Sequence, residues 1–265
     1  MKTAVVFDCS GTLVDVKRII KEVESQKFLC NHQTVDMVDK KRGRVLVVIG
    51  ENIPILSIDP DMLMRDLLER VKWRITYCHP PIFKGNILKD SKTKVKELQD
   101  PASILNRFNI ETEPGYALIC DTIEGKVEYT IATGGCLFDG VHETIEELKK
   151  IGVEIYIASG DSKYAIERLS KLIGIEEDHI LPEAHQHLKR DLVLRLKREG
   201  YKVIMVGDGT NDVPAMLESD LSVINLQGGK VSKKALDTAD VKIENIREVV
   251  DIVRRFKDSN LLTSV

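Results

Sequence analysis

Short apolar runs alternate with amphipathic stretches over the C-terminal half of the chain. The run at 153–158 is followed by helical spacing over 161–172, and Gly174 stands where that helix would end. The same alternation continues with apolar runs at 202–206 and 221–224 and with helical patterns at 140–151, 188–198, 213–217 and 246–256. Strands and helices that alternate at this spacing predict a parallel sheet covered by helices on both faces. A further strand of this sheet is expected at 3–7, which is far in sequence from the other strands.

Residues between about 17 and 114 follow a different pattern. It predicts helices at 17–29 and 62–72, a hairpin over 44–49 and 53–58, and two short helices within 89–109, broken at Pro101. A second hairpin, 116–121 and 126–132, turns at Glu124 and Gly125 and returns the chain to the sheet. We therefore expect an α/β fold with a Rossmann-like parallel core formed by residues 1–16 and 115–265. Residues 17–114 would form an inserted, smaller α+β cap domain.

Composition narrows the classes of function. The 265 residues are 43% hydrophobic, which excludes a disordered chain, and the net charge of −3 gives no reason to expect a nucleic-acid or membrane partner. Apolar runs such as 45–49 are far shorter than the roughly 18 residues that a membrane span needs, and the N-terminus has no signal-peptide pattern. Five scattered cysteines without a CxxC pair favour a reducing, cytoplasmic setting. The oligomeric state stays open.

Polar segments follow the predicted strands, and the first two carry the carboxylates of Asp8 and Asp161 and several hydroxyls. Asp8 comes directly after the first strand, in Asp8-Cys9-Ser10-Gly11-Thr12, where a buried carboxylate is costly unless it is paired. In the second segment, 159–161, the Ser159 hydroxyl and the Gly160 N–H could bind a phosphate oxygen. Each segment taken alone is also compatible with an ordinary loop or helix cap.

The other two segments supply a cation and a pair of carboxylates. Lys189 lies early in a predicted helix, where it could neutralise a phosphoryl group, although Arg190 and Lys202 are alternatives and most lysines are solvated. In the turn 207–212, Asp208 and Asp212 stand four residues apart with Asn211 between them. Such an oxygen-rich turn suits Mg²⁺. Because the carboxyl ends of parallel strands form one crevice, all four segments are expected to converge.

In this order and context the four motifs resemble those of the haloacid dehalogenase superfamily, over roughly residues 1–16 and 115–257. The segments 158–161 and 207–217 are most similar to the phosphorylation domain of P-type ATPases, and the insert lies where their nucleotide domain does. With no predicted membrane helix and no actuator domain, ion pumping is not expected. The resemblance implies a P-type ATPase-like hydrolase that acts on a small phosphorylated substrate.

The resemblance also implies roles for individual residues. Asp8 would be the nucleophile that forms an aspartyl phosphate, and Lys189 would offset the phosphoryl charge. Phosphate oxygens would be held by side chains and N–H groups of Thr12, Ser159, Gly160 and Asn211. Mg²⁺ would be held by Asp8, the Ser10 main-chain oxygen and Asp208, with Asp212 in support.

This sequence departs from the family pattern two residues after the nucleophile. Most phosphatases of the superfamily have an aspartate there, as general acid and base, but this chain has Ser10. Such acid–base help is typically worth ~10²–10⁴-fold in rate, so slow turnover or a good leaving group, as in ATP or another phosphoanhydride, is expected. Glu51 or Asp59 of the insert could supply a base. The alternative is a catalytically weak regulatory protein that binds phosphate or a phosphoprotein in the same crevice.

Overall fold

The computed structural model describes residues 2–30, 32–50, 53–229 and 231–262, with side chains up to 259. The chain divides into two compact units, Met1–Asp15 with Cys136–Val265, and Val16–Gly135. The hairpin expected at 116–132 therefore belongs to the second unit and not to the core, so a boundary at 114 is wrong by the length of that hairpin. Within the described residues, no helix combines the length and the apolar character that a membrane crossing requires.

The first unit is built on a parallel sheet, as predicted; it has six strands, two more than expected, because β9 and β12 were not foreseen. Its strand order is β12-β11-β10-β1-β8-β9. The strands are β1 (Lys2–Phe7), β8 (Glu154–Ala158), β9 (Ile180–Leu181), β10 (Tyr201–Gly207), β11 (Leu221–Asn225) and β12 (Val241–Ile243). Residues 4–7 of β1 are fully buried, because this strand is central and covered on both faces.

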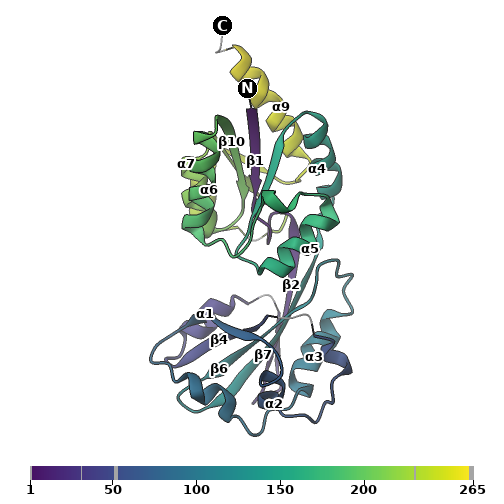
Figure 1. Cartoon of the computed structure of the whole chain (residues 1–265), viewed down its shortest axis with the longest axis vertical. Helices are drawn as coiled ribbons and strands as arrows, with labels where there is room; N and C mark the ends of the chain where they lie inside the picture. Colours follow the sequence, from purple (N-terminus) through teal and green to yellow (C-terminus); the bar gives the residue numbers. More distant parts are fainter. Residues whose placement is uncertain (1, 31, 51–52, 230, 263–265) are drawn as a thin grey trace. The chain divides into compact units, whose positions relative to one another are not determined.

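Helices cover both faces of this sheet (Figure 1). One face carries α4 (Val141–Lys150), α5 (Lys163–Ile173) and α9 (Glu248–Leu262), and the other α6 (Gln186–Arg198), α7 (Val213–Glu218) and α8 (Lys233–Thr238). Short 3₁₀ turns lie at Glu177–His179 and Thr210–Asp212. The helix α5 begins at Ser162, whose side chain accepts a hydrogen bond from the Ala165 N–H (3.3 Å), and ends at Gly174 with φ of 71°. The predicted stop at Gly174 is confirmed.

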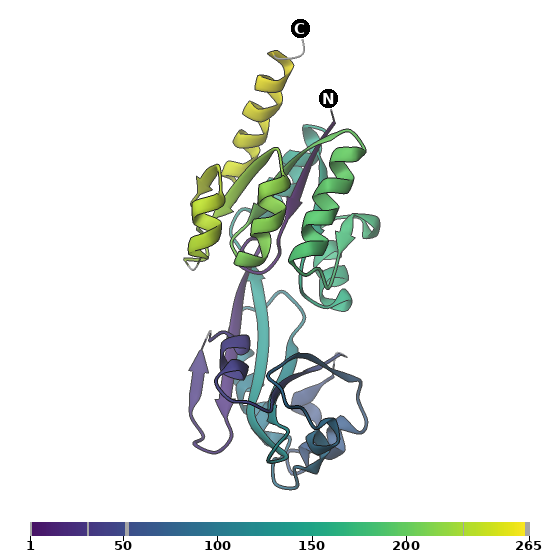
Figure 2. The ribbon, with the colours of Figure 1, turned by 90° about the vertical axis from the view of Figure 1, so that its left-hand side faces the viewer.

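The second unit is built on a six-stranded sheet of order β3-β2-β7-β6-β4-β5 (Figure 2). Its strands are β2 (Val14–Glu22), β3 (Phe28–Cys30), β4 (Arg44–Ile49), β5 (Trp73–Cys78), β6 (Gly115–Asp121) and β7 (Lys126–Leu137). Its helices are α1 (Thr34–Asp39), α2 (Met64–Leu68) and α3 (Lys96–Leu105), with 3₁₀ turns at Ile55–Ser57 and Lys84–Lys89. The expected smaller α+β unit is therefore present.

Two predictions within this unit are wrong. The helix expected at 17–29 is the strand β2, since Ile19 and Ile20 pack into hydrophobic clusters on opposite faces of the sheet. A strand covered on both faces does not alternate, and its apolar neighbours imitate helical spacing. The strand expected at 53–58 contains a 3₁₀ turn, and β4 pairs instead with β5 and β6.

The break expected at Pro101 is also absent, because α3 runs through it. Proline has no N–H for the carbonyl four residues earlier, which is that of Glu97. The Thr130 hydroxyl on β7 donates to this carbonyl instead, at 2.6 Å. The helix therefore continues because the neighbouring strand satisfies the freed acceptor.

Candidate active site

Strand register brings the polar segments to one edge of the parallel sheet. Phe7 at the end of β1 pairs with Val206 on one side and Ile157 on the other. The residues that follow these strands, Asp8, Ser159 and Asp208, therefore emerge together. The Asp8 N–H extends the ladder by donating to the Val206 carbonyl at 2.9 Å.

A fully buried lysine joins two of the carboxylates. The Lys189 ammonium, on the first turns of α6, donates to Asp8 Oδ1 at 2.5 Å and to Asp212 Oδ1 at 2.7 Å. Both Lys189 and Asp212 are inaccessible to solvent, and Asp8 is 4% exposed. A buried ammonium is tolerated only when it is paired and hydrogen-bonded. The choice of Lys189 agrees with this geometry, whereas Arg190 pairs with Asp191 and Lys202 with Asp220.

Asp212 already uses both of its carboxylate oxygens. While Oδ1 accepts from Lys189, Oδ2 accepts from the N–H groups of Asp208 (3.2 Å) and Gly209 (2.9 Å). Gly207 makes room for this side chain, since a Cβ at that position would lie 2.6 Å from the Asp212 carboxyl carbon. Asp212 thus holds the turn that carries Asp208.

The loop after β1 packs closely against Asp208. Gly11 has φ of 89°, and a Cβ there would lie 2.2 Å from Asp208 Oδ2, so both backbone and space require glycine. The buried Thr12 hydroxyl donates to Asp208 Oδ1 at 3.3 Å. The Thr12 carbonyl accepts from the side chain of Asn225, at the end of β11, at 2.9 Å. Thr12 therefore lies at the site, directed at a carboxylate.

Burial and mutual repulsion raise the pKa values of Asp8 and Asp208. Burial raises the pKa of Asp8 well above its usual value, Asp212 raises it further, and Lys189 only partly offsets both. Burial and then Asp212 raise the pKa of Asp208 to about 7. Burial lowers the pKa of the Lys189 ammonium, but the Asp8 and Asp212 carboxylates outweigh it and raise this pKa overall.

The cluster fits a divalent cation. Asp8, Asp208 and Asp212 each offer a carboxylate oxygen, and these atoms lie within 4.8 Å of one another. A hard divalent ion with oxygen ligands would offset the repulsion among these carboxylates, which contributes to the raised pKa values of Asp8 and Asp208. Since Asp212 is engaged on both oxygens, Asp8 and Asp208 are the carboxylates best placed to bind it, with Asp212 supporting them.

The serines of the first two segments meet at one carboxylate. Asp161 Oδ2 accepts hydrogen bonds from Ser10 Oγ at 3.0 Å and from Ser159 Oγ at 2.8 Å. Ser159 is buried at the end of β8, whereas Gly160 is exposed beside it. Asn211 is also exposed, on the turn after Asp208. These last two residues lie at the rim.

A family model described as haloacid dehalogenase-like hydrolase matches residues 2–220. The chain belongs to the haloacid dehalogenase-like hydrolases. It is 58% identical to the soluble P-type ATPase-like phosphatase of Methanocaldococcus jannaschii over 258 residues, 96% of this chain and 94% of that protein. The resemblance drawn from the four motifs is confirmed.

Other similarities lie among P-type ATPases. The probable copper-importing P-type ATPase A of Enterococcus hirae is 34% identical over 122 residues, 46% of this chain and 16% of that protein. The catalytic domain of the CPx-ATPase CopB-B has a similar fold, with a TM-score of 0.53 and 17% identity over 96% of this chain and 89% of that one. At that identity, this likeness shows the fold.

Two residues that shape the site of this haloacid dehalogenase-like hydrolase were given no role by the sequence: Asp161, which ends the second segment, and Asn225, which was not singled out. Asp161 is the shared acceptor of Ser10 and Ser159, and Asn225 positions the loop after β1. Asn225 is fully buried. The sequence does carry a signal for Asn225, because this polar residue directly follows the apolar run 221–224, just as Asp8 follows the strand expected at 3–7.

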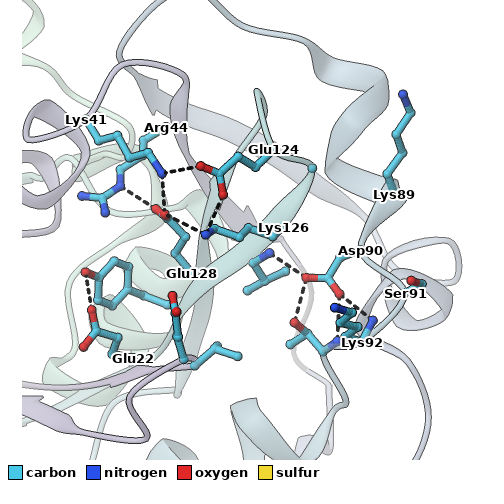
Figure 3. Close-up of a pocket in the computed structure, with 16 residues that line it drawn as sticks. Glu22, Lys41, Arg44, Lys89, Asp90, Ser91, Lys92, Glu124, Lys126 and Glu128 are labelled. Carbon is cyan, nitrogen blue, oxygen red and sulfur yellow. Dashed lines mark hydrogen bonds and ion pairs between the residues drawn. The ribbon is translucent and has the colours of Figure 1, made fainter.

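The second unit of this hydrolase contains a cavity of about 770 Å³ with charged walls (Figure 3). Lys41 pairs there with Glu124 and Glu128, Arg44 with Glu128 at 2.6 Å, and Lys126 with Glu124 at 2.6 Å. These charged side chains satisfy one another, whereas Lys89 and Lys92 also line the cavity. Of the suggested bases, Glu51 lies outside the described residues, and the Asp59 carboxylate accepts from the Asp61 N–H in a local turn.

Proposed function

We propose that this hydrolase is a Mg²⁺-dependent phosphatase that acts through an aspartyl phosphate on Asp8. The observation that carries the proposal is the buried Lys189, which bridges Asp8 and Asp212 beside Asp208 at the edge of the parallel sheet. The 58% identical relative is named a phosphatase, which supports the same chemistry here.

Each residue of the site would have a distinct role in catalysis or in metal binding. Asp8 attacks phosphorus in line, while the Lys189 ammonium offsets charge on the phosphoryl oxygens. Asp8, Asp208 and the Ser10 main-chain oxygen would hold the ion, which supplies further positive charge at the phosphoryl group. Asp212 keeps Lys189 and the 207–209 turn in place through its two occupied oxygens.

Phosphate contacts would come from the rim and from the ends of the strands. The Gly160 N–H and the Asn211 side chain are exposed and could approach a phosphoryl oxygen, and Ser159 lies next to them. Thr12 would contribute mainly by fixing Asp208, to which its hydroxyl already donates.

The substrate class follows from the residue two positions after Asp8. A serine at that position cannot protonate a poor leaving group near neutral pH. ATP or another phosphoanhydride, whose leaving group needs little protonation, is therefore favoured over a simple phosphate ester, and turnover would be slow.

A panel of phosphorylated compounds tests this function. Phosphate release from ATP, acetyl phosphate, p-nitrophenyl phosphate and sugar phosphates is measured with Mg²⁺ and with EDTA. We expect Mg²⁺-dependent release that is fastest with the anhydrides and absent in Asp8→Asn. The matched control is Asp251→Asn, the same charge change at an exposed residue of α9. Full activity in Asp8→Asn would refute the proposal.

The second candidate is a regulatory protein that binds phosphate in the same site without turnover. It is favoured by the Ser10 hydroxyl, which stands where most phosphatases of the superfamily have an acid and is already hydrogen-bonded to Asp161. Under this alternative, calorimetry detects Mg²⁺-dependent binding of orthophosphate, while no compound of the panel releases phosphate. Ser10→Asp would then gain phosphatase activity.

A further inference from the structure

Asp161 joins two loops of the site that are far apart in sequence. Its Oδ2 accepts from Ser10, in the loop after β1, and from Ser159, at the end of β8. The Ser10 contact spans 151 positions of the chain and ties the loop of the nucleophile to the neighbouring strand. Asp161 is itself held locally, because its N–H donates to Ser159 Oγ at 3.2 Å.

These hydrogen bonds determine what each serine can still do. A hydroxyl has one proton and two lone pairs. Ser10 gives its proton to Asp161 and makes no other hydrogen bond to the described residues, so both of its lone pairs remain available as acceptors. Ser159 gives its proton to the same oxygen, but it already accepts from the Asp161 N–H, and its side chain is also within hydrogen-bonding reach of Cys9. Ser10 is thus held as an acceptor.

An acceptor at this position suits the water that would hydrolyse the aspartyl phosphate. In that step a bond forms between the water oxygen and phosphorus, and the bond between phosphorus and the Asp8 oxygen breaks. Asp8 leaves as a carboxylate, and both water protons end on the released dihydrogen phosphate. Because no net proton passes to the protein, a group that only orients the water can assist this step.

We propose that Asp161 is a positioning residue that acts through Ser10, fixing the Ser10 hydroxyl as the acceptor that orients the attacking water. This inference rests on the proposed function, since it assigns the water step of the same site. It explains how the chain can turn over without the aspartate that most phosphatases of the superfamily have two residues after the nucleophile. Ser10 then touches the water, and Asp161 touches Ser10.

Oxygen exchange tests the water step without knowledge of the substrate. Orthophosphate labelled with ¹⁸O is incubated with the full chain and Mg²⁺, and loss of label to water is followed by mass spectrometry. Each exchange requires formation and hydrolysis of phospho-Asp8. Orthophosphate affinity is measured in parallel by calorimetry, and folding by circular dichroism.

The variants separate a hydrogen-bonding role from a charge role. We expect Ser10→Ala and Asp161→Ala to slow exchange by about 10- to 100-fold, with orthophosphate affinity within about threefold of wild type. Asp161→Asn retains an acceptor oxygen and is expected to keep most of the exchange rate. The double variant Ser10→Ala/Asp161→Ala should be no slower than Ser10→Ala. If Asp161→Ala does not fold, Asp161→Leu, of similar size, replaces it.

Two results would overturn the inference while leaving the proposed function intact. One is exchange at the wild-type rate in a folded Asp161→Ala or Asp161→Leu. The other is an equal further loss when the Asp161 change is added to Ser10→Ala, which would show that Asp161 acts independently of Ser10. Failure of the proposed function would give a different result. In that case wild type would show no oxygen exchange, or Asp8→Asn would exchange oxygen as fast as wild type.

Discussion

Lys189 makes the two buried carboxylates beside it tolerable. It contacts Asp8 and Asp212 within a region closed to solvent, so neither carboxylate has bulk water to stabilise its charge. A buried pair of this kind adds little net stability compared with apolar side chains, but removing one partner is costly. The lysine is therefore required for the fold of the site as well as for its chemistry.

Replacement of Lys189 by methionine, which has a similar length but no charge, should lower both the stability of the protein and its activity. We expect Lys189→Met to lose about 3–5 kcal/mol of unfolding free energy in EDTA, measured by urea denaturation, and to lose most activity. The control is Lys150→Met, at an exposed lysine of α4. A Lys189→Met protein as stable as wild type in EDTA would contradict the buried pairing.

Asp208 should make the stability of the metal-free protein fall as pH rises. Its pKa is raised from 3.8 to about 7 in the folded state, so between these values the folded protein binds a proton that the unfolded chain has released. Unfolding free energy therefore decreases with pH over this window, by at most about 1.4 kcal/mol per unit. Above a pH of about 7 the folded protein has also released this proton, so Asp208 no longer makes the unfolding free energy depend on pH.

The contribution of Asp208 is isolated by difference. Unfolding free energies of wild type and Asp208→Asn are compared in EDTA at several pH values between 4 and 8. We expect wild type to lose stability relative to Asp208→Asn as pH rises to about 7. A constant difference across this range would show that Asp208 has an ordinary pKa.

At the scale of the elements, the site depends on tight loops at the ends of well-predicted strands. The strand β1 and the turn after β10 could be predicted because buried parallel strands are short apolar runs that end abruptly in polar residues. Convergence of Asp8, Lys189 and Asp208 followed from the crevice rule for parallel sheets. What the pattern could not supply was contact between loops, such as Ser10 with Asp161 or Thr12 with Asp208.

The Gly11 loop allows this close approach to be tested with a matched glycine. Gly11 and Gly152 both have positive φ, but only a Cβ at Gly11 would meet Asp208, whereas none of the described atoms lies within 4 Å of a Cβ at Gly152. We expect Gly11→Ala to weaken Mg²⁺ binding at least about tenfold, measured from the Mg²⁺ dependence of activity. Gly152→Ala shares the backbone strain and should bind Mg²⁺ as wild type does. Equal Mg²⁺ affinity in both variants would contradict the account.

At the scale of the whole molecule, the chain carries two separate cores on two kinds of sheet. The parallel unit was predicted closely, because its pattern is local and repeats with each strand and helix. The inserted unit was predicted poorly, since its sheet pairs distant segments, as β4 does with β6, and buries both faces of strands such as β2. Pairing of this kind leaves little signal in any one window of sequence.

All the described residues of the acidic cluster belong to the first unit. Binding of Mg²⁺ and orthophosphate should therefore slow amide hydrogen exchange in β1 and β10 of that unit. The amides of β4 and β6, in the second unit, should change much less. Mass spectrometry of peptic peptides measures amide hydrogen exchange in all four strands in one experiment. Greater protection of β4 and β6 than of β1 and β10 would place the binding site in the other unit.

Covalent phosphorylation of Asp8 is the central step of the proposed function. The direct measurement is to incubate the protein with Mg²⁺ and a phosphoanhydride such as acetyl phosphate, quench in acid, and locate the added mass by peptide sequencing. We predict a phosphoryl group on Asp8 that is absent without Mg²⁺ and absent in Asp8→Asn, and that persists longer in Ser10→Ala. Phosphate released with no phosphoryl group on Asp8 at any quench time, or a phosphoryl group on another residue, would contradict the mechanism.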